Sequence, residues 1–212
     1  MKNKIYLVVG TLALFFAGFL IGVKVYKDRE KERLSFLSQK DFSTFVRTHS
    51  PKKGPEKPSV YLTEFLDPEC ESCRSFHSVV DKILLEYPDK IQLVVRYAPF
   101  HGNSLFAIKI LEAARKQNKY WETLDLLFRK QPEWGGHHHP RPELIWDYLP
   151  ELGLNIDEIK KDLNDISTDE KINQDKADGE TLAVRGTPTF FVNGKAVELS
   201  YQDLKNAIEA EL

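Results

Sequence analysis

The chain opens with a long apolar stretch that differs from the rest of the sequence. Residues 5–23 contain no charged side chain, and a helix of these 19 residues would span about 28 Å, close to the hydrocarbon thickness of a bilayer. A helix that is apolar on every face over this length is untypical of a soluble core. We therefore expect a basic flank at residues 1–4 and a transmembrane anchor at residues 5–23, with a signal sequence as the alternative.

Charged side chains dominate the next segment, residues 24–58. It starts with a charged run that favours helix, has only a weak apolar pattern between Leu34 and Val46, and ends in a proline-rich stretch over residues 51–58. Proline lacks a backbone N–H and interrupts regular structure, and the sustained heptads of a coiled coil are missing. We interpret these residues as a solvated spacer.

From residue 59 to the C-terminus the apolar pattern alternates between strand and helix periods. Val60–Leu66 and Ile91–Tyr97 are apolar on both faces, which is typical of central strands covered by helices. The further predicted elements are helices at 70–87, 104–117, 120–129, 142–152, 156–163 and 168–183, strands at 189–192 and 195–199 around an Asn-Gly turn, and a closing helix at 201–212. This order predicts one α/β domain, residues 59–212, whose small sheet is interrupted by a helical insertion at about residues 103–183.

The amino-acid composition excludes several classes of protein. Hydrophobic residues make up 42% and charged residues 29% of the 212 residues, as in ordinary folded proteins. The 30 basic side chains are balanced by 32 acidic ones, so we expect no nucleic-acid partner, because phosphate binding needs a basic face. Two cysteines are too few for a disulfide-stapled mini-protein or a four-cysteine zinc module.

The two cysteines form the motif Cys70-Glu71-Ser72-Cys73, at the point where a predicted strand gives way to a predicted helix. The N-terminus of a helix carries about half a positive charge, which stabilises a thiolate relative to a thiol. Cys70 is therefore expected to be the exposed nucleophile, and Cys73, one turn inside the helix, to resolve a mixed disulfide. The motif favours disulfide exchange.

Three other uses of the two thiols remain open. A structural disulfide across this four-residue ring would stabilise the fold by only about 2 kcal/mol, and a zinc site would need two more ligands. Copper could bind the thiols together with His77, which shares a helix face with Cys73, or with the histidine run His137, His138 and His139. Three successive histidines cannot all point one way, so we place them on a loop outside the site and expect no resident metal.

Glu64 is the other unusual residue, because it lies six positions before Cys70 in a strand that is apolar on both faces. Its neighbours of the same parity, Leu62 and Leu66, are apolar. A carboxyl in such a place is poorly hydrated, so its ionised form is costly and its pKa is raised. The alternative is an ordinary glutamate at a sheet edge.

The thiol motif is followed roughly 115 residues later by Gly186-Thr187-Pro188-Thr189, which leads into the predicted strand pair. Together these segments resemble the thioredoxin superfamily, and more narrowly the DsbA-like thiol–disulfide oxidoreductases of bacterial envelopes. The resemblance extends from about Val60 to the C-terminus, and residues 119–128 are similar to part of the family's helical insertion. It implies an α/β thioredoxin fold with an inserted helical subdomain, preceded here by one N-terminal transmembrane helix.

The resemblance also implies roles for individual residues. Pro188 corresponds to a proline that follows a cis peptide bond beside the cysteines, and Thr187 and Pro188 together shape the surface that binds substrate peptides. Glu64 corresponds to a buried acid that relays protons or tunes the pKa of the redox pair. Glu71 and Ser72 depart from the Pro-His pair of the most oxidising members, and because an acidic side chain favours the thiolate less, the direction of exchange stays open.

We therefore expect a membrane-anchored thiol–disulfide oxidoreductase without a cofactor, which exchanges disulfides with envelope proteins and with a membrane or periplasmic redox partner. The anchor would hold the catalytic domain in the periplasm or extracytoplasmic space at the inner membrane. The basic residues between Lys24 and Arg33 favour the opposite orientation, but a long domain can translocate regardless of such charges. The alternatives are a copper-handling thioredoxin-like protein that uses the same thiols and a noncatalytic scaffold.

Overall fold

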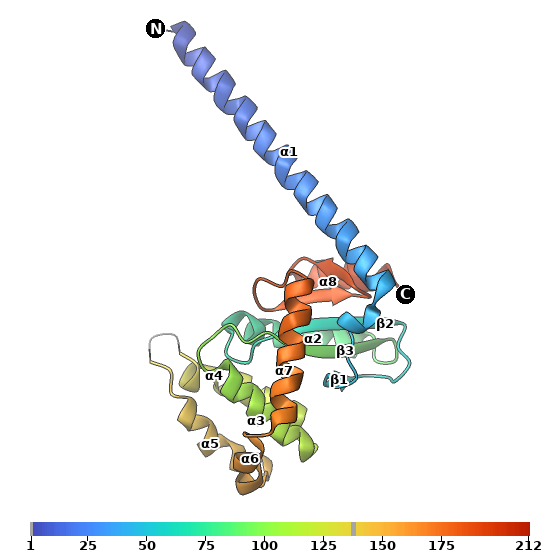
Figure 1. Ribbon diagram of the computed structural model, residues 1–212, viewed down its shortest axis with the longest axis vertical. Coiled ribbons are helices and arrows are strands. Elements are labelled where there is room, and N and C mark those ends of the chain that lie inside the picture. The colour runs from blue at the N-terminus through green and yellow to red at the C-terminus, as the bar shows by residue number, and fades with distance from the viewer. Residues whose placement is uncertain (1, 137–138) are drawn as a thin grey trace.

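A long N-terminal helix leads into an α/β domain in the computed structural model, which describes residues 2–136 and 139–212 (Figure 1). Helix α1 (Lys2–Lys40) runs without interruption through the predicted anchor and the first half of the predicted spacer. Among the described residues, one helix is long and apolar enough to cross a membrane, over Gly10–Leu34. Large apolar side chains of this helix, such as Leu14 and Phe15, are 74% and 79% exposed, so it is not packed as a core helix.

The second half of the predicted spacer belongs to the folded domain. After the 3-10 helix η1 (Phe42–Thr44), Phe45 is fully buried and its ring centroid lies 5.2 Å from that of Phe191. Arg47 donates two hydrogen bonds to the Asp178 carboxylate, at 2.7 and 2.8 Å. The predicted spacer boundary at residue 58 is therefore wrong, because these side chains bind the segment to the rest of the domain.

Strand β1 (Lys52–Lys53) lies inside the proline-rich stretch that was expected to break regular structure. It pairs antiparallel with β3 (Ile91–Tyr97), and the carbonyl oxygen of Pro51 accepts a hydrogen bond from the N–H of Val95 at 3.0 Å. Pro51 and Pro55 flank the short strand instead of interrupting it, which is why two residues can still join the edge of the sheet.

The sheet contains five strands in the order β1-β3-β2-β4-β5. Strand β2 (Val60–Leu66) runs parallel to β3, and both strands have the bounds expected from their apolar pattern. Strand β4 (Thr189–Val192) pairs antiparallel with the other side of β2, and β5 (Lys195–Val197) follows at the edge. Strand β2 is therefore central, and its C-terminal end leads the chain directly into the thiol motif.

Side chains of β2 alternate between the two faces of the sheet. Leu62 and Leu66 join the larger core, which includes residues of α2 (Glu71–Glu86) and α8 (Tyr201–Glu209). Phe65 instead joins a smaller cluster on the opposite face, formed with η1 and β4. Because Glu64 shares the parity of Leu62 and Leu66, its carboxyl lies on the face covered by α2.

A helical insertion separates β3 from β4, as predicted, and helices α3 to α6 gather at one side of the sheet (Figure 1). Its elements are α3 (Ser104–Lys116), α4 (Tyr120–Trp134), η2 (Pro142–Leu144), α5 (Ile145–Tyr148), η3 (Leu149–Leu152), α6 (Ile156–Asp162) and α7 (Ile166–Thr181). The single helix expected at 142–152 is divided into three short turns that end at Gly153, whose φ of 68° is left-handed. Helix α4 extends past its predicted end at residue 129, because Trp134 is fully buried and its indole N–H donates to the Leu127 carbonyl oxygen.

Candidate active site

Cys70 lies at the N-cap of α2, directly after the loop that follows β2. Its pKa is lowered to about 5, because the Cys73 thiol donates a hydrogen bond to its sulfur and the Thr187 side chain and the N–H groups of Cys73 and Ser72 add further hydrogen bonds, which together outweigh burial. The thiol is less exposed than predicted: Cys70 is only 7% exposed. Glu71 and Ser72, between the two cysteines, are exposed.

The pKa of Cys73 shifts in the direction opposite to that of Cys70. Cys73 lies in the first turn of α2 and is fully buried, and both cysteines are free thiols. Burial raises the pKa of Cys73 well above its ordinary value, and the hydrogen bond to Cys70 and the charge of Glu64 raise it further. The motif therefore contains one thiol that ionises easily and one that holds its proton, as expected for a nucleophile and a resolving cysteine.

The loop before β4 packs against Cys70. The peptide bond between Thr187 and Pro188 is cis, as the resemblance implied, and the Thr187 carbonyl oxygen lies 3.2 Å from the Cys70 sulfur. These two segments are 117 residues apart in the sequence. The antiparallel pairing of β4 with β2 brings them together at the end of the sheet where β2 terminates.

Glu64 lies below the thiol motif in the central strand and is only 3% exposed. Its partners at the same level are Val95 on β3 and Phe190 on β4, both apolar and buried. Burial raises the pKa of Glu64 to about 8, although the positive charge of His77 acts in the opposite direction. The burial of this carboxyl agrees with the apolar pattern of the strand, and its role toward the cysteine pair stays a prediction.

A buried aspartate, which the sequence pattern does not single out, holds the loop that carries Cys70. Asp67 is fully buried. Its carboxylate accepts hydrogen bonds from the Glu69 N–H at 2.8 Å and the Ser104 hydroxyl at 2.6 Å, and from the Phe100 N–H and the His101 ring nitrogen at 2.8 Å each. It thus joins the loop after β2 to the loop after β3.

His101 lies near Cys70 and was also missed. Burial alone would lower its pKa, but the hydrogen bond to Asp67 and the negative charges of Asp67, Cys70 and Glu69 raise the pKa overall. The negative charges around the partly exposed His101 ring, that of Cys70 among them, therefore favour its protonated form. The position of His101 near Cys70 could have been predicted from the sequence. Parallel strands present their carboxyl ends at the same edge of a sheet, and His101 follows β3 closely, as Cys70 follows β2.

The helical insertion supplies a second support for the loop. The Gln131 side-chain amide, from α4, donates to the carbonyl oxygens of Pro68 and Cys70 at 2.8 and 3.0 Å. Glu69 accepts hydrogen bonds from both the backbone and the side-chain nitrogen of Asn103, at 2.6 and 2.7 Å. The insertion therefore fixes the backbone on which Cys70 is presented.

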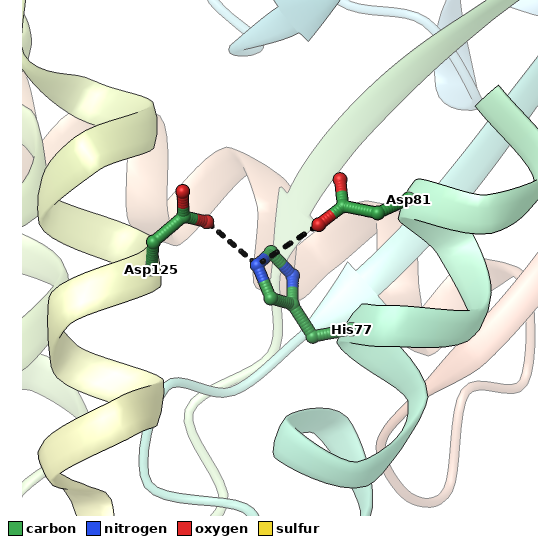
Figure 2. A group of neighbouring side chains, drawn as sticks. All are labelled: His77, Asp81 and Asp125. Atoms are coloured by element: carbon green, nitrogen blue, oxygen red, sulfur yellow. Dashed lines mark hydrogen bonds and ion pairs between the residues drawn. The ribbon is translucent and has the colours of Figure 1, made fainter. Parts of the chain in front are cut away.

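His77, one turn after Cys73 on α2, forms a group of ion pairs with Asp125 and Asp81 (Figure 2). Its Nε2 atom lies 2.7 Å from an Asp125 carboxylate oxygen on α4 and 3.7 Å from one of Asp81, one turn along α2. Ligand atoms of these residues lie within 4.8 Å of one another, a spacing that would suit a cation. However, His77 already shares its nitrogen with Asp125, and Lys53 donates to Asp81 at 3.1 Å, so we interpret the group as ion pairs.

The copper alternative named His77 and the histidine run. His77 is directed at Asp125, and its ring packs on Phe128 with centroids 5.0 Å apart. His137 and His138 lie outside the described residues, and His139 is exposed. The described geometry therefore gives His77 a partner other than a thiol-bound metal.

The central parallel strand pair, the CxxC motif at the start of α2, the facing cis-proline loop and the helical insertion together define a DsbA-like protein of thioredoxin fold. The chain belongs to the thioredoxin family, because the family model described as Thioredoxin matches residues 47–210.

Two kinds of relatives share this domain. The chain is 33% identical to a Na(+)/H(+) antiporter NhaA of Herminiimonas arsenicoxydans over 70% of its own length, but it spans only 23% of that relative. It is 28% identical to a probable disulfide bond formation protein D of Bacillus anthracis, with 91% of this chain and 90% of that protein covered. The second kind of relative therefore matches almost from end to end.

Solved structures show the same fold. The thiol–disulfide exchange protein alpha-DsbA2 from Wolbachia pipientis superposes with a TM-score of 0.73 at 21% identity, covering 86% of this chain and 97% of that one. Oxidised BdbD from Bacillus subtilis superposes with a TM-score of 0.69 at 25% identity, covering 76% of this chain and 92% of that one.

Proposed function

We propose that this chain is a thiol–disulfide oxidoreductase that exchanges disulfides with other proteins through Cys70 and Cys73. The observation that carries the proposal is the placement of the two thiols: Cys70 lies at the N-cap of α2 against the Thr187 carbonyl oxygen, and Cys73 is fully buried. This placement lowers the pKa of Cys70 and raises that of Cys73. The nearly full-length match to proteins named for disulfide bond formation supports it.

The exchange begins on Cys70. When the pair is oxidised, a substrate thiolate attacks the Cys70 sulfur, the bond between the two cysteines breaks, and Cys73 leaves and takes a proton from Glu64. A second substrate thiolate then attacks the substrate sulfur of the mixed disulfide, and Cys70 leaves as a stabilised thiolate. The substrate gains a disulfide and loses two electrons to the cysteine pair. Thr187 and Pro188, beside Cys70, form part of the surface on which the substrate peptide lies.

We further propose that the pair works mainly as an oxidant. A thiolate with a pKa of about 5 stabilises the reduced form, which makes the disulfide more oxidising. Equilibration with glutathione should give a reduction potential well above that of thioredoxin, about −270 mV. A potential at or below that value would assign the pair a reducing role.

Trapping of the mixed disulfide tests the roles of the two cysteines. Cys73→Ser leaves Cys70 free to react but removes the resolving thiol, so substrates should remain attached through Cys70. Cys70→Ser is the matched control and should trap nothing. Trapping through Cys73 in the Cys70→Ser variant would contradict the assignment.

The same proposal places α1 in the inner membrane and the domain in the periplasm or extracytoplasmic space, where disulfides persist. The exposed apolar helix at the N-terminus supports an anchor. Alkaline phosphatase fused after Leu212 should be active, whereas a fluorescent protein that folds only in the cytoplasm should stay dark. The reverse pattern would contradict both the location and an envelope role.

A further inference from the structure

The side chain of Gln131, on α4, uses its full hydrogen-bonding capacity at the start of α2. It is only 1% exposed. Its Nε2 atom donates to the carbonyl oxygens of Pro68 and Cys70, at 2.8 and 3.0 Å. Its Oε1 atom accepts a hydrogen bond from the Nε–H of Arg74 at 2.9 Å. Because a side-chain amide offers two N–H donors and one acceptor oxygen, each of these three groups has a partner.

Arg74 acts on the Cys70 carbonyl oxygen by two routes. It directly follows Cys73 in α2 and is exposed. Its backbone N–H donates to the Cys70 carbonyl oxygen at 3.1 Å, while its side chain binds the amide that donates to the same oxygen. The backbone of Cys70 is therefore bound from its own helix and from the insertion, and Arg74 takes part in both contacts.

The C-terminal end of α4 confines the stem of Gln131. The N–H of Gly135 donates to the Gln131 backbone carbonyl oxygen at 2.8 Å. A Cβ atom on Gly135 would lie 3.3 Å from the Cγ atom of Gln131 and 3.4 Å from that of Glu69, a close approach that glycine permits because it has no side chain. The amide is therefore held from the side of α4 as well as by its hydrogen bonds.

The hydrogen bond from Arg74 determines which way the amide faces. If the amide turned over, its oxygen would face the carbonyl oxygens of Pro68 and Cys70, and its N–H groups would face the Arg74 donor. If instead the Arg74 donor were absent, the buried Oε1 atom would lose its partner, which costs free energy. The side chain would then move to find another donor, and the two carbonyl oxygens would lose theirs.

We infer that Arg74 is a positioning residue for the nucleophile: through the Gln131 amide it fixes the backbone of Cys70 and thereby the place of the attacking sulfur. This inference rests on the proposed function, in which Cys70 is the nucleophile. The sulfur lies 3.2 Å from the Thr187 carbonyl oxygen, and N–H groups in the first turn of α2 stabilise its ionised form. Movement of the Cys70 backbone would weaken these hydrogen bonds, so the thiolate would be less stable.

The test follows alkylation of the reduced full chain, in detergent, by iodoacetamide across pH. This reagent reacts with the thiolate and needs no protein substrate. Arg74→Met removes the donor, whereas Arg74→Gln removes the charge but keeps an N–H group at the same distance along the side chain. In Arg74→Met the midpoint of the pH profile should move upward, with an acid dissociation constant of Cys70 about fivefold smaller, the effect of about one lost hydrogen bond. Arg74→Gln should stay close to the wild type.

Two further variants show whether Arg74 acts through the amide. Gln131→Leu should move the midpoint in the same direction as Arg74→Met, and the double variant should go no further than Gln131→Leu alone. Arg129→Met is the matched control, because it removes an arginine from α4 whose side chain is 61% exposed and lies 3.7 Å from Glu151. It should leave the alkylation profile unchanged.

Three results would overturn the inference. One is an equal shift in Arg74→Gln and Arg74→Met, because the lost charge would then be the cause. Another is an unchanged midpoint in both Arg74→Met and Gln131→Leu. The third is slower reaction of Arg74→Met with a disulfide-bonded peptide while its alkylation is unchanged, because Arg74 would then contact the substrate directly. If the midpoint shifts as expected but the wild type forms no mixed disulfide with the peptide, the positioning role is supported and the proposed function fails instead.

Discussion

At the scale of single residues, the site depends on what surrounds each ionisable group. Cys70, Cys73 and Glu64 lie within one turn of helix and one strand, yet hydrogen bonds lower the pKa of the first, and burial raises the pKa of the other two. Before a substrate binds, the surroundings therefore favour a negative charge on Cys70 and a proton on Cys73 and on Glu64. Two predictions follow from the signs of these shifts.

The first prediction concerns the reduced protein and Cys70. Because its pKa in the folded protein, about 5, lies below that of an unfolded thiol, about 8.5, the thiolate stabilises the folded state. This gain is complete above about pH 8.5 and is lost as the pH falls through about 5. Urea unfolding should show the reduced wild type losing stability relative to Cys70→Ser over this range. A constant difference between the two proteins would contradict the low pKa.

The second prediction concerns Glu64→Leu. The folded-state pKa of Glu64 is raised from 4.5 to about 8, so stability is present below about pH 4.5 and is lost as the pH rises toward 8. Removing the carboxyl should stabilise the protein by a few kcal/mol at about pH 8, since each pKa unit corresponds to about 1.4 kcal/mol, and by little at about pH 5. Urea midpoints at both pH values measure this. An equal stabilisation at both pH values would indicate that ionisation of the Glu64 carboxyl is not its cause.

At the scale of elements, the thiol motif is held by loops and helices that come from three separate parts of the chain. Strand β2 delivers the cysteines, the loop after β3 binds Asp67, and α4 binds the loop through Gln131. The loop that precedes Cys70 therefore has little freedom of its own. Its position depends on the insertion as much as on the sheet.

The third prediction tests that dependence with Asp67→Ala. The substitution leaves the N–H groups of Glu69 and Phe100 and the buried Ser104 hydroxyl without their acceptor, which should destabilise the protein by about 3 kcal/mol. The pKa of Cys70 should also change, because the hydrogen bond between Asp67 and the His101 ring is lost. Asp169→Ala, at a 47% exposed surface ion pair, is the control and should cost less than about 0.5 kcal/mol. Similar losses in both variants would contradict the role of Asp67.

Local pattern predicted some elements well and others poorly, for identifiable reasons. The bounds of β2 and β3 matched because both strands are buried on both faces, so every position carries the signal. Strand β1 could not be predicted from Lys52 and Lys53, because its pairing depends on a partner some forty residues away. The thiol motif, Pro188 and Glu64 could be named from the sequence, whereas the contacts of Asp67, His101 and Gln131 depend on long-range packing that no local period encodes.

At the scale of the whole molecule, the segment after α1 is part of the catalytic domain. Arg96 is fully buried, and its guanidinium donates to Asp175 at 2.8 Å and also to Asp178 on α7. Asp178 binds Arg47 as well, and Asp175 lies 2.7 Å from the ring nitrogen of His49. This buried charge group joins residues before the sheet, the sheet itself and the last helix of the insertion.

The fourth prediction compares two truncated chains. A chain that begins at residue 41 keeps Phe45, Arg47 and β1, and it should unfold cooperatively. A chain that begins at residue 59 loses the burial of Phe45, which alone is worth on the order of 4 kcal/mol, and leaves Asp178 without Arg47. Urea unfolding followed by circular dichroism should show the shorter chain unfolded or strongly destabilised. Equal stability of the two truncated chains would instead support a spacer that extends to residue 58.

The proposed position of the continuous helix α1 in a bilayer has a consequence for where the thiol meets its substrates. Between residue 24 and Lys40 it continues for about 25 Å at 1.5 Å per residue, and it contacts the domain directly, since Leu34 is buried and Arg33 donates to the Thr181 carbonyl oxygen at 2.7 Å. With α1 in a bilayer, as proposed, this helix acts as a stiff arm and not as a flexible tether. Cys70 is then carried at a set height above the lipid and encounters its substrates by lateral diffusion, which favours proteins that present their cysteines at that same height.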